Sequence, residues 1–279
     1  MPGIAARIEA FPRQCVSSGA QVLSFREAGD GVPVVLLHGI GSGSGSWLYQ
    51  LEQLRSEFRV IAWDAPGYGQ STPLPGEHPR ACDYAEALGR LVDAKGLSRF
   101  HLVGHSLGAL IAAAFCRVAP DRVRSLSLID PAIGYGALDP AVRRDKLAER
   151  LRLIRELGPE GLAEARAKEL VSEAASSEAL ELVKWNMSRL SVRGYSQAAS
   201  MLASGNLLEE ARRLDVPVLV LCGSRDRITP ETVARQVAQA YGTARYVSLP
   251  ALGHASYVEG PEIVNAYLTE VFHGGAGAG

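Results

Sequence analysis

Uninterrupted apolar runs alternate with amphipathic stretches through the first 130 residues of the chain. The runs are apolar at successive positions rather than at alternate ones, a pattern typical of parallel strands that helices cover on both faces. They comprise residues 32–37, 59–63, 100–103 and 123–129. Apolar side chains at helical spacing occupy the intervals, at residues 46–56, 83–96 and 106–118. This alternation predicts βαβ units and an α/β fold with a mostly parallel sheet.

The strand pattern is absent from about residue 134 to residue 210. Apolar residues at helical spacing stand there among charges of both signs, in residues 140–156, 159–173, 180–190 and 195–202. Strand and helix patterns resume at residues 216–221, 230–241, 244–249 and 261–272. We therefore predict a core of residues 1–133 and 211–273, an inserted helical cap of residues 134–210, and a flexible tail of residues 274–279.

The composition is that of a globular protein. Of the 279 residues, 47% are hydrophobic and 21% are charged, which permits a sizeable core and excludes a disordered or fibrous chain. The net charge of −1 offers no basic surface to a polyanion, so nucleic acid is not an expected partner. The start of the chain lacks the pattern of a secretory leader, and no apolar stretch has the length of a membrane span. We expect a cytoplasmic protein that acts on a small molecule away from membranes.

The sharpest chemical signal is the pentapeptide Gly104-His105-Ser106-Leu107-Gly108. It lies where a predicted strand ends and a predicted helix begins, the context in which a G-x-S-x-G sequence raises a serine above the sheet on a sharp turn. The glycines avoid collisions in that turn, and the helix start directs backbone N–H groups toward a bound oxyanion. The pattern predicts Ser106 as a catalytic nucleophile.

A nucleophilic serine needs a base, and the base needs an acid that orients it. Among the six histidines, His254 alone lies in a loop after a late predicted strand, which favours it as the base. Two aspartates, Asp226 and Asp130, follow predicted strands and compete for the acid. Both lie at the carboxyl edge of the sheet, where sites of open α/β folds form. We favour Asp226, because Asp130 is followed directly by Pro131, a sequence that is more typical of the end of a strand before an inserted segment.

An oxyanion must be held by backbone N–H groups. We predict one at Leu107, directly after the serine, and one at Ile40, in the glycine-rich loop of residues 38–45. A phosphate-binding loop is the alternative interpretation of that segment. However, neither a Gly-Lys-Ser/Thr sequence nor a GxGxxG sequence is present, so no nucleotide is expected.

No sequence feature indicates a metal or a cofactor. The four cysteines stand at positions 15, 82, 116 and 222, and none belongs to a CxxC pair. This spacing fits neither a zinc ribbon nor a disulfide framework. We therefore predict that the protein uses no metal and no cofactor.

Taken together, these motifs resemble the α/β-hydrolase fold across nearly the whole chain. The matching segments are His38-Gly39, residues 64–71, residues 104–108, Asp226, and Gly253-His254. The order Ser, Asp, His is the one that this family uses, and the serine distinguishes the chain from branches with an aspartate nucleophile. The resemblance implies an eight-stranded, mostly parallel sheet, a helical cap inserted at residues 134–210, and a serine hydrolase mechanism.

Within this family the chain is similar to small carboxylesterases and enol-lactonases. Its glycine-rich loop and Trp47 are also similar to those of carbon–carbon hydrolases that open meta-cleavage products of aromatic rings. Those hydrolases typically have Asn before the nucleophile and Trp soon after the catalytic histidine, where this chain has His105 and Tyr257. We expect a small to medium apolar ester or an enol-lactone as substrate. Carbon–carbon hydrolysis is the second hypothesis, and a non-catalytic ligand receptor is the third.

Residues of the predicted cap are expected to select the substrate. Candidates for an apolar pocket are Trp47, Tyr135, Trp185 and Met187, with Tyr195 and Met201 as further aromatic or flexible side chains. The alternative is that these residues pack the cap against the core. Arg189 and Arg193 are candidates for binding a substrate carboxylate, against the alternative of a solvated surface position. The sequence does not indicate an oligomeric state.

Overall fold

The computed structural model describes residues 2–274 and contains one eight-stranded sheet. Its strands are β1 (Gln14–Ser18), β2 (Gln21–Ala28), β3 (Val32–Leu37), β4 (Phe58–Trp63), β5 (Phe100–His105), β6 (Val123–Ile129), β7 (Val218–Gly223) and β8 (Arg245–Leu249). The order across the sheet is β1-β2-β4-β3-β5-β6-β7-β8. Strands β3 to β8 pair in parallel, whereas β2 is antiparallel to both β1 and β4. The predicted α/β fold with a mostly parallel eight-stranded sheet is confirmed.

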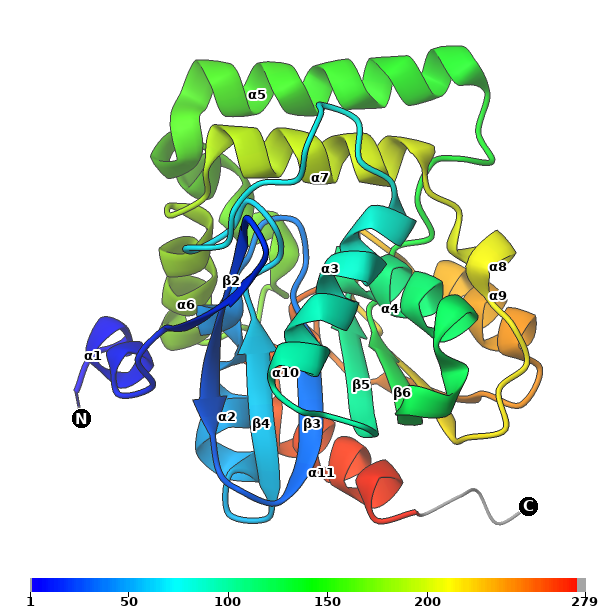
Figure 1. The fold of residues 1–279 in the computed structure, drawn as a ribbon. Coiled ribbons are helices and arrows are strands. Elements are labelled where there is room, and N and C mark those ends of the chain that lie inside the picture. Colours follow the sequence, from blue (N-terminus) through cyan, green and yellow to red (C-terminus); the bar gives the residue numbers. More distant parts are fainter. Residues whose placement is uncertain (1, 275–279) are drawn as a thin grey trace.

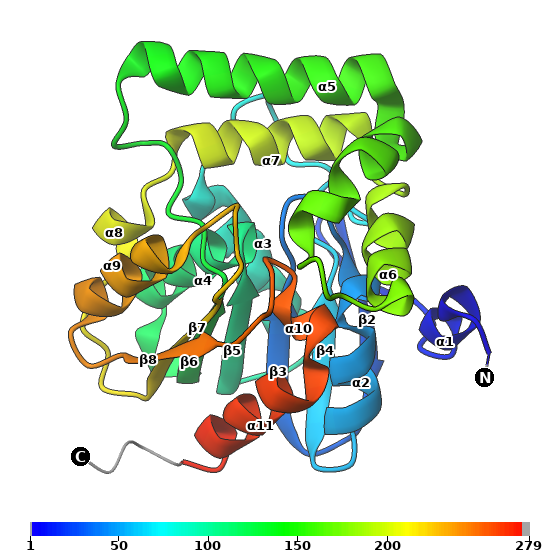
Figure 2. The ribbon, with the colours of Figure 1, turned by 180° about the vertical axis from the view of Figure 1, so that it is seen from behind.

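Helices cover both faces of this sheet (Figures 1 and 2). The helices are α1 (Ile4–Glu9), α2 (Leu48–Leu54), α3 (Ala81–Ala94), α4 (Leu107–Val118), α5 (Pro140–Arg166), α6 (Ser177–Met187), α7 (Val192–Ser204), α8 (Leu207–Glu210), α9 (Glu231–Tyr241), α10 (Ser256–Glu259) and α11 (Pro261–Phe272). Single 3₁₀ turns are η1 (Ser44–Trp47), η2 (Pro120–Arg122) and η3 (Ala167–Leu170). Side chains of α3, α4 and α9 form one apolar core, and those of α2 and α11 form a second core on the opposite face.

Two strands and one helix at the start of the chain have no counterpart in the sequence prediction. Strands β1 and β2 form the edge hairpin of the sheet, and β1 is mostly exposed. Its polar sequence, Gln14 to Ser18, therefore lacks the continuous apolar run that identifies the central strands. Helix α1 has only six residues, too few for a clear helical periodicity.

A helical layer formed by α5, η3, α6 and α7 lies over the carboxyl ends of the parallel strands (Figure 1). Two separate helices were expected over residues 140–156 and 159–173. Helix α5 consists of two helical segments that meet at Gly158, whose φ of 65° and ψ of 177° are not helical, and the second segment begins at Pro159. Glycine tolerates the positive φ at the end of the first segment, and proline, which lacks a backbone donor, suits the start of the second. The predicted break between two helices is therefore present, and the second segment ends at Arg166, where η3 follows.

The chain enters and leaves this region at one narrow neck. The segment that leads into α5 and the segment that follows α7 are joined by backbone hydrogen bonds of 2.8 Å. The donor–acceptor pairs are Tyr135 N to Leu202 O, Gly136 N to Gly205 O, and Leu207 N to Ile133 O. The helices between these points begin and end at this neck, and further bonds join them to core loops, such as Ser191 Oγ to Gly67 O at 2.8 Å and Ala255 N to Leu170 O at 2.7 Å.

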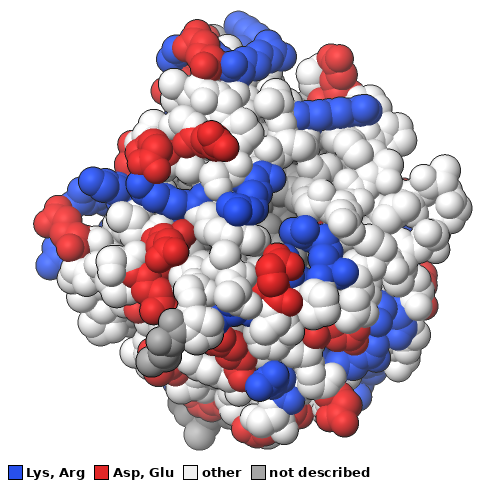
Figure 3. Space-filling view, turned by 90° about the vertical axis from the view of Figure 1, so that its left-hand side faces the viewer, with Lys and Arg blue, Asp and Glu red and all other residues white. Residues whose placement is uncertain are grey.

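The surface at the left of Figure 1 carries acidic and basic side chains interspersed with uncharged ones (Figure 3). No helix within residues 2–274 is both long enough and apolar enough to cross a membrane. The expected tail of residues 274–279 lies outside the described residues, apart from Gly274.

Candidate active site

Ser106 occupies the sharp turn between β5 and α4. Its backbone angles are φ 51° and ψ −114°, a strained conformation that persists only where the surroundings impose it. Three backbone hydrogen bonds hold it there: Ser106 N donates to Ile129 O at 3.0 Å, and Ser106 O accepts from Ala109 N at 3.0 Å and from Ala132 N at 3.2 Å. The turn places the serine in the wall of a cavity beneath the helical layer.

The glycines that flank the serine allow α4 to pack against the strands. A Cβ atom at position 108 would lie 2.2 Å from Leu37 O, and one at position 104 would lie 2.5 Å from Gly108 O. Both clashes are with backbone atoms, which cannot rotate away. The turn therefore requires glycine at these two positions.

Gly108→Ala is expected to lower the free energy of unfolding by about 2–4 kcal/mol, because the strand and the helix must separate to admit the methyl group. Gly89→Ala is the matched control. Gly89 lies inside α3, and a Cβ atom there would meet nothing within 4 Å. The control is expected to stabilise the protein by about 0.5–1 kcal/mol. Urea unfolding measures both changes, and equal effects at the two positions would contradict the packing argument.

His254 and Asp226 form a hydrogen-bonded pair at the ends of two neighbouring strands. His254 Nδ1 lies 2.8 Å from Asp226 Oδ2. Asp226 Oδ1 accepts from the backbone N–H groups of Ile228 at 2.7 Å and Thr229 at 2.9 Å, which fix the orientation of the carboxylate. His254 and Ser106 line the same cavity. Within residues 2–274 their side chains are not hydrogen-bonded to each other, and such bonds often tighten only when substrate binds.

The surrounding charges suit His254 to act as a base. Burial lowers its pKa, but the hydrogen bond and the negative charge of Asp226 outweigh burial and raise the pKa above its usual value. Burial likewise opposes ionisation of Asp226, yet the hydrogen bond from His254 brings the pKa of this carboxyl below its usual value. The ring of His105 lies 5.0 Å from that of His254, and burial and the charge of His254 lower the pKa of His105 to about 3. His105 is therefore neutral beside the base.

Asp130, the competing acid, lies behind the pair and has other partners. Its Oδ1 accepts from Gly223 N at 2.8 Å, and its Oδ2 accepts from Ser256 Oγ at 2.6 Å. Burial and the negative charge of Asp226 raise the pKa of Asp130 to about 7. The geometry thus brings Asp226, and not Asp130, to the imidazole of His254.

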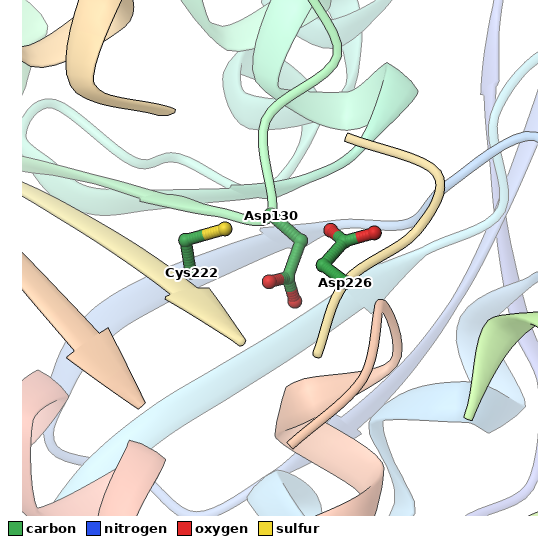
Figure 4. Close-up of side chains that lie close together, drawn as sticks. All are labelled: Asp130, Cys222 and Asp226. Atoms are coloured by element: carbon green, nitrogen blue, oxygen red, sulfur yellow. The ribbon is translucent and has the colours of Figure 1, made fainter. Parts of the chain in front are cut away.

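Three buried potential metal ligands lie close together behind the site (Figure 4). Asp130, Cys222 and Asp226 offer ligand atoms within 4.8 Å of one another. Hydrogen bonds account for all three, since the carboxylates have the partners given above and Cys222 Sγ donates to Thr229 O at 3.5 Å. Burial, together with the neighbouring carboxylates, raises the pKa of Cys222, so this group is a thiol that can donate its hydrogen bond to Thr229 O. The cluster supports the loop that carries Asp226.

The two predicted oxyanion donors belong to the cavity that Ser106 lines. Ile40 and Leu107 both line the cavity, and neither backbone N–H donates to another of the described residues. The glycine-rich loop that carries Ile40 is fixed from outside. Ile40 O accepts from the hydroxyl of Tyr68 at 2.9 Å, and Asp64 Oδ1 accepts from Ser44 N at 2.8 Å. Both N–H groups are therefore available to a ligand next to Ser106.

The cavity has a volume of about 470 Å³ and lies between the sheet edge and the helical layer. Of the predicted substrate-binding residues, Tyr135 and Met187 line it, and so does Tyr195. Trp47 and Trp185 are not among its lining residues. Trp47 is fully buried in the core, where its ring packs 4.2 Å from that of Tyr257.

Two arginines of α5 line the cavity, Arg150 and Arg166, and the sequence prediction considered neither. The predicted candidates, Arg189 and Arg193, are both exposed, and neither lines the cavity. Arg189 covers the ring of Trp185 at 4.1 Å. Prediction from sequence also did not identify Thr229, whose Oγ1 lies 2.8 Å from Asp226 Oδ2 and 3.1 Å from His254 Nδ1.

Comparisons with known proteins found hydrolases of similar sequence or fold. RutD from Klebsiella pneumoniae (strain 342), provisionally assigned as a carbamate hydrolase, is 30% identical over 248 residues, which cover 86% of this chain and 91% of RutD. A thermophilic esterase from Thermogutta terrifontis superposes with a TM-score of 0.85 at 29% identity, over 95% of this chain and 99% of the esterase. The enol-lactonase from Burkholderia xenovorans LB400 shares the fold, with a TM-score of 0.82 at 23% identity over 93% of this chain and 100% of the enol-lactonase.

Residues 32–261 match the sequence profile of the alpha/beta hydrolase fold. The matched range extends from β3 to the first residue of α11. It includes the strained serine and the histidine–aspartate pair described above. The chain therefore belongs to the α/β-hydrolase fold family.

Proposed function

We propose that this hydrolase is a serine enzyme that cleaves a carboxylic ester or an enol-lactone through an acyl-enzyme. In this mechanism Ser106 attacks the acyl carbon while His254, oriented by Asp226, accepts the hydroxyl proton. The N–H groups of Ile40 and Leu107 bind the oxyanion of the tetrahedral intermediate. The leaving group departs with the proton from His254, and water then cleaves the acyl-enzyme with His254 again as the base.

The observation that carries this proposal is the strained turn at Ser106, which faces the same cavity as the His254–Asp226 pair. Strain of this kind persists where it serves a site. An acyl group is the expected target, because the two free N–H groups beside Ser106 stabilise a negative oxygen. The similarity to a solved esterase and to RutD supports hydrolysis of an ester or a related acyl compound such as a carbamate.

Carbon–carbon hydrolysis is the second candidate and makes a further chemical demand. Its leaving group is a carbanion, so the site must direct a proton to carbon. His105 stands where the meta-cleavage hydrolases typically have Asn. Its Nε2 is 2.9 Å from His254 O, and burial, with the charge of His254, lowers its pKa to about 3. A neutral, engaged imidazole of this kind is a poor proton donor, which favours the ester or lactone.

The test compares kcat/KM for p-nitrophenyl acetate and butyrate, an enol-lactone, a phenyl carbamate and a phenyl-substituted oxo-dienoate. This ratio reports binding of the transition state from the free enzyme. We expect the esters or the lactone to exceed the dienoate. A higher value for the dienoate would make carbon–carbon hydrolysis the activity. Tight binding of an ester without turnover would instead favour the non-catalytic receptor.

The pH dependence provides a further prediction. His254 must be neutral to accept a proton, so kcat/KM is expected to rise with pH through the pKa of His254 and to be lost below it. Because Asp226 raises this pKa, the midpoint should lie above the ordinary histidine value of about 6.5. A pH profile on p-nitrophenyl butyrate measures the midpoint. A midpoint clearly below 6.5 would show that Asp226 does not stabilise the imidazolium.

A further inference from the structure

The cavity wall formed by α5 contains an arginine that lacks an acidic partner. Arg150 Nη2 donates to the hydroxyl of Tyr135 at 2.9 Å, and Nη1 donates to the hydroxyl of Tyr195 at 3.5 Å. In the described part of the chain no carboxylate lies within 4.0 Å of its guanidinium. All three residues line the cavity. The two tyrosines thus hold the guanidinium in place without neutralising it.

Two other arginines whose side chains are withdrawn from solvent have acidic partners. Arg13 pairs with the buried Asp64 at 2.8 Å, and the fully buried Arg26 pairs with Glu9 at 3.0 Å. Arg150 differs because its charge remains uncompensated beside a cavity. Burial lowers the pKa of the half-buried Arg150, but Tyr135 and Tyr195 outweigh burial and raise the pKa above its usual value, so the guanidinium stays charged and attracts an anionic group.

The other charged residues of the cavity wall do not remove this positive charge. Lys146, one helical turn before Arg150, has its Nζ 5.1 Å from the centre of the Tyr135 ring and has no carboxylate within 4.0 Å in residues 2–274. Arg166 also lines the cavity, but it is paired at 2.9 Å with Glu169, which does not line the cavity. Glu149 is the one acidic side chain among the lining residues described. The α5 wall is therefore cationic overall.

The positive charge of Arg150 also reaches the proposed catalytic centre. It is one of the charges that act on His254, where it opposes Asp226 by lowering the histidine pKa. An anionic group bound at Arg150 would lie in the same cavity as Ser106. A single substrate molecule can therefore contact both residues.

We propose that Arg150 is a specificity residue that binds a carboxylate of the substrate, so that the preferred substrates are half-esters or lactones with a free carboxylate. The proposal rests on the proposed ester or lactone hydrolysis. A guanidinium presents its N–H groups as a planar fork that matches the two oxygens of a carboxylate. Tyr135 and Tyr195 each occupy one N–H group, which leaves others of the five for the substrate.

The experiment uses two matched series of ethyl esters. Monoethyl esters of dicarboxylic acids from succinate to suberate carry the carboxylate, and the corresponding ethyl ester amides are neutral analogues of similar shape. For the best chain length, the wild type is expected to favour the acid over the amide in kcat/KM by about 10- to 100-fold. Arg150→Gln should abolish that preference, so that kcat/KM for the acid equals kcat/KM for the amide in the same variant. Arg150→Lys, which keeps the charge but loses the fork, should retain part of the preference.

Arg189→Gln is the control, because Arg189 is an exposed arginine of the helical layer that does not line the cavity. It should leave the preference unchanged. Thermal unfolding establishes that each variant is folded. An equal loss of kcat/KM for the acid and the amide in Arg150→Gln would show that Arg150 only ties α5 to Tyr135 and Tyr195. A wild type without preference for the acid at any chain length would overturn the proposal.

A binding measurement separates this proposal from the proposed function. Calorimetry measures the binding of adipate, a dicarboxylate that needs no hydrolysis, to the wild type and to Arg150→Gln. Binding by the wild type alone, together with no turnover of any ester, would support the carboxylate site and overturn ester hydrolysis. Turnover of neutral esters, with equal adipate binding by the two proteins or none by either, would support ester hydrolysis and overturn the carboxylate site.

Discussion

Ser106→Ala is expected to lower kcat on any hydrolysed ester by about 10⁴- to 10⁶-fold, because the members of a catalytic triad act as a unit. The fold should remain intact. The serine hydroxyl is not hydrogen-bonded to another described residue, so its removal leaves no buried partner unpaired. Wild-type turnover by the alanine variant would show that Ser106 is not the nucleophile. A fluorophosphonate that labels the wild type at Ser106, and fails to label the variant, would locate the reactive group independently.

A glycine at the same position separates strain from chemistry. Ser106→Gly should be as inactive as the alanine variant. Glycine adopts φ 51° at no steric cost, whereas alanine retains the strain of the serine. The glycine variant is therefore expected to be more stable than the alanine variant by about 1 kcal/mol, measured by urea unfolding. Greater stability of the alanine variant would contradict the presence of backbone strain.

Asp226→Asn is expected to lower kcat by about 10⁴-fold. The asparagine oxygen can keep the hydrogen bonds from the N–H groups of Ile228 and Thr229. The asparagine NH₂ group then faces His254 Nδ1. An amide donor at Nδ1 stabilises the tautomer that carries its proton on Nε2, and this tautomer cannot accept the proton of Ser106. The steady-state rate on p-nitrophenyl butyrate measures the loss.

Asp130→Asn is the matched control for this prediction. Asp130 is bonded to Gly223 N and Ser256 Oγ and reaches His254 only through its charge, which raises the histidine pKa. We expect a loss in kcat of at most about 10-fold, with the ascending limb of the pH profile moved to lower pH. If this variant lost more activity than Asp226→Asn, Asp130 would be the acid.

The positions of Ser106, Asp226 and His254 can be predicted from sequence because each follows a strand of one parallel sheet. Carboxyl ends of parallel strands meet at one edge, so a local pattern already implies which residues are near each other. The edge hairpin of β1 and β2 could not be predicted in this way, since the polar run of β1 does not differ from a loop in its pattern.

The composition of the cavity wall could not be predicted, because it depends on how helices pack. Arg150, Tyr135 and Tyr195 are separated by 15 and 45 positions and come together only where α5 lies on α7. Trp47 and Met187 are equally apolar candidates in the sequence. Nevertheless, Trp47 fills the core beside Tyr257 while Met187 reaches the cavity. Hydrophobicity indicates burial but not whether the neighbour is protein or ligand.

The paired backbone at the neck has a consequence for how this chain can change. The bonds from Tyr135 to Leu202 and from Gly136 to Gly205 hold the two crossing points together whatever sequence lies between them. The entropy of closing such a loop grows only with the logarithm of its length, by about 0.6 kcal/mol for each doubling. A roof of another length would therefore cost little entropy at the neck and would remodel the binding chamber. It would also have to replace a bond to the loop of the base, where Ala255 N donates to Leu170 O at 2.7 Å.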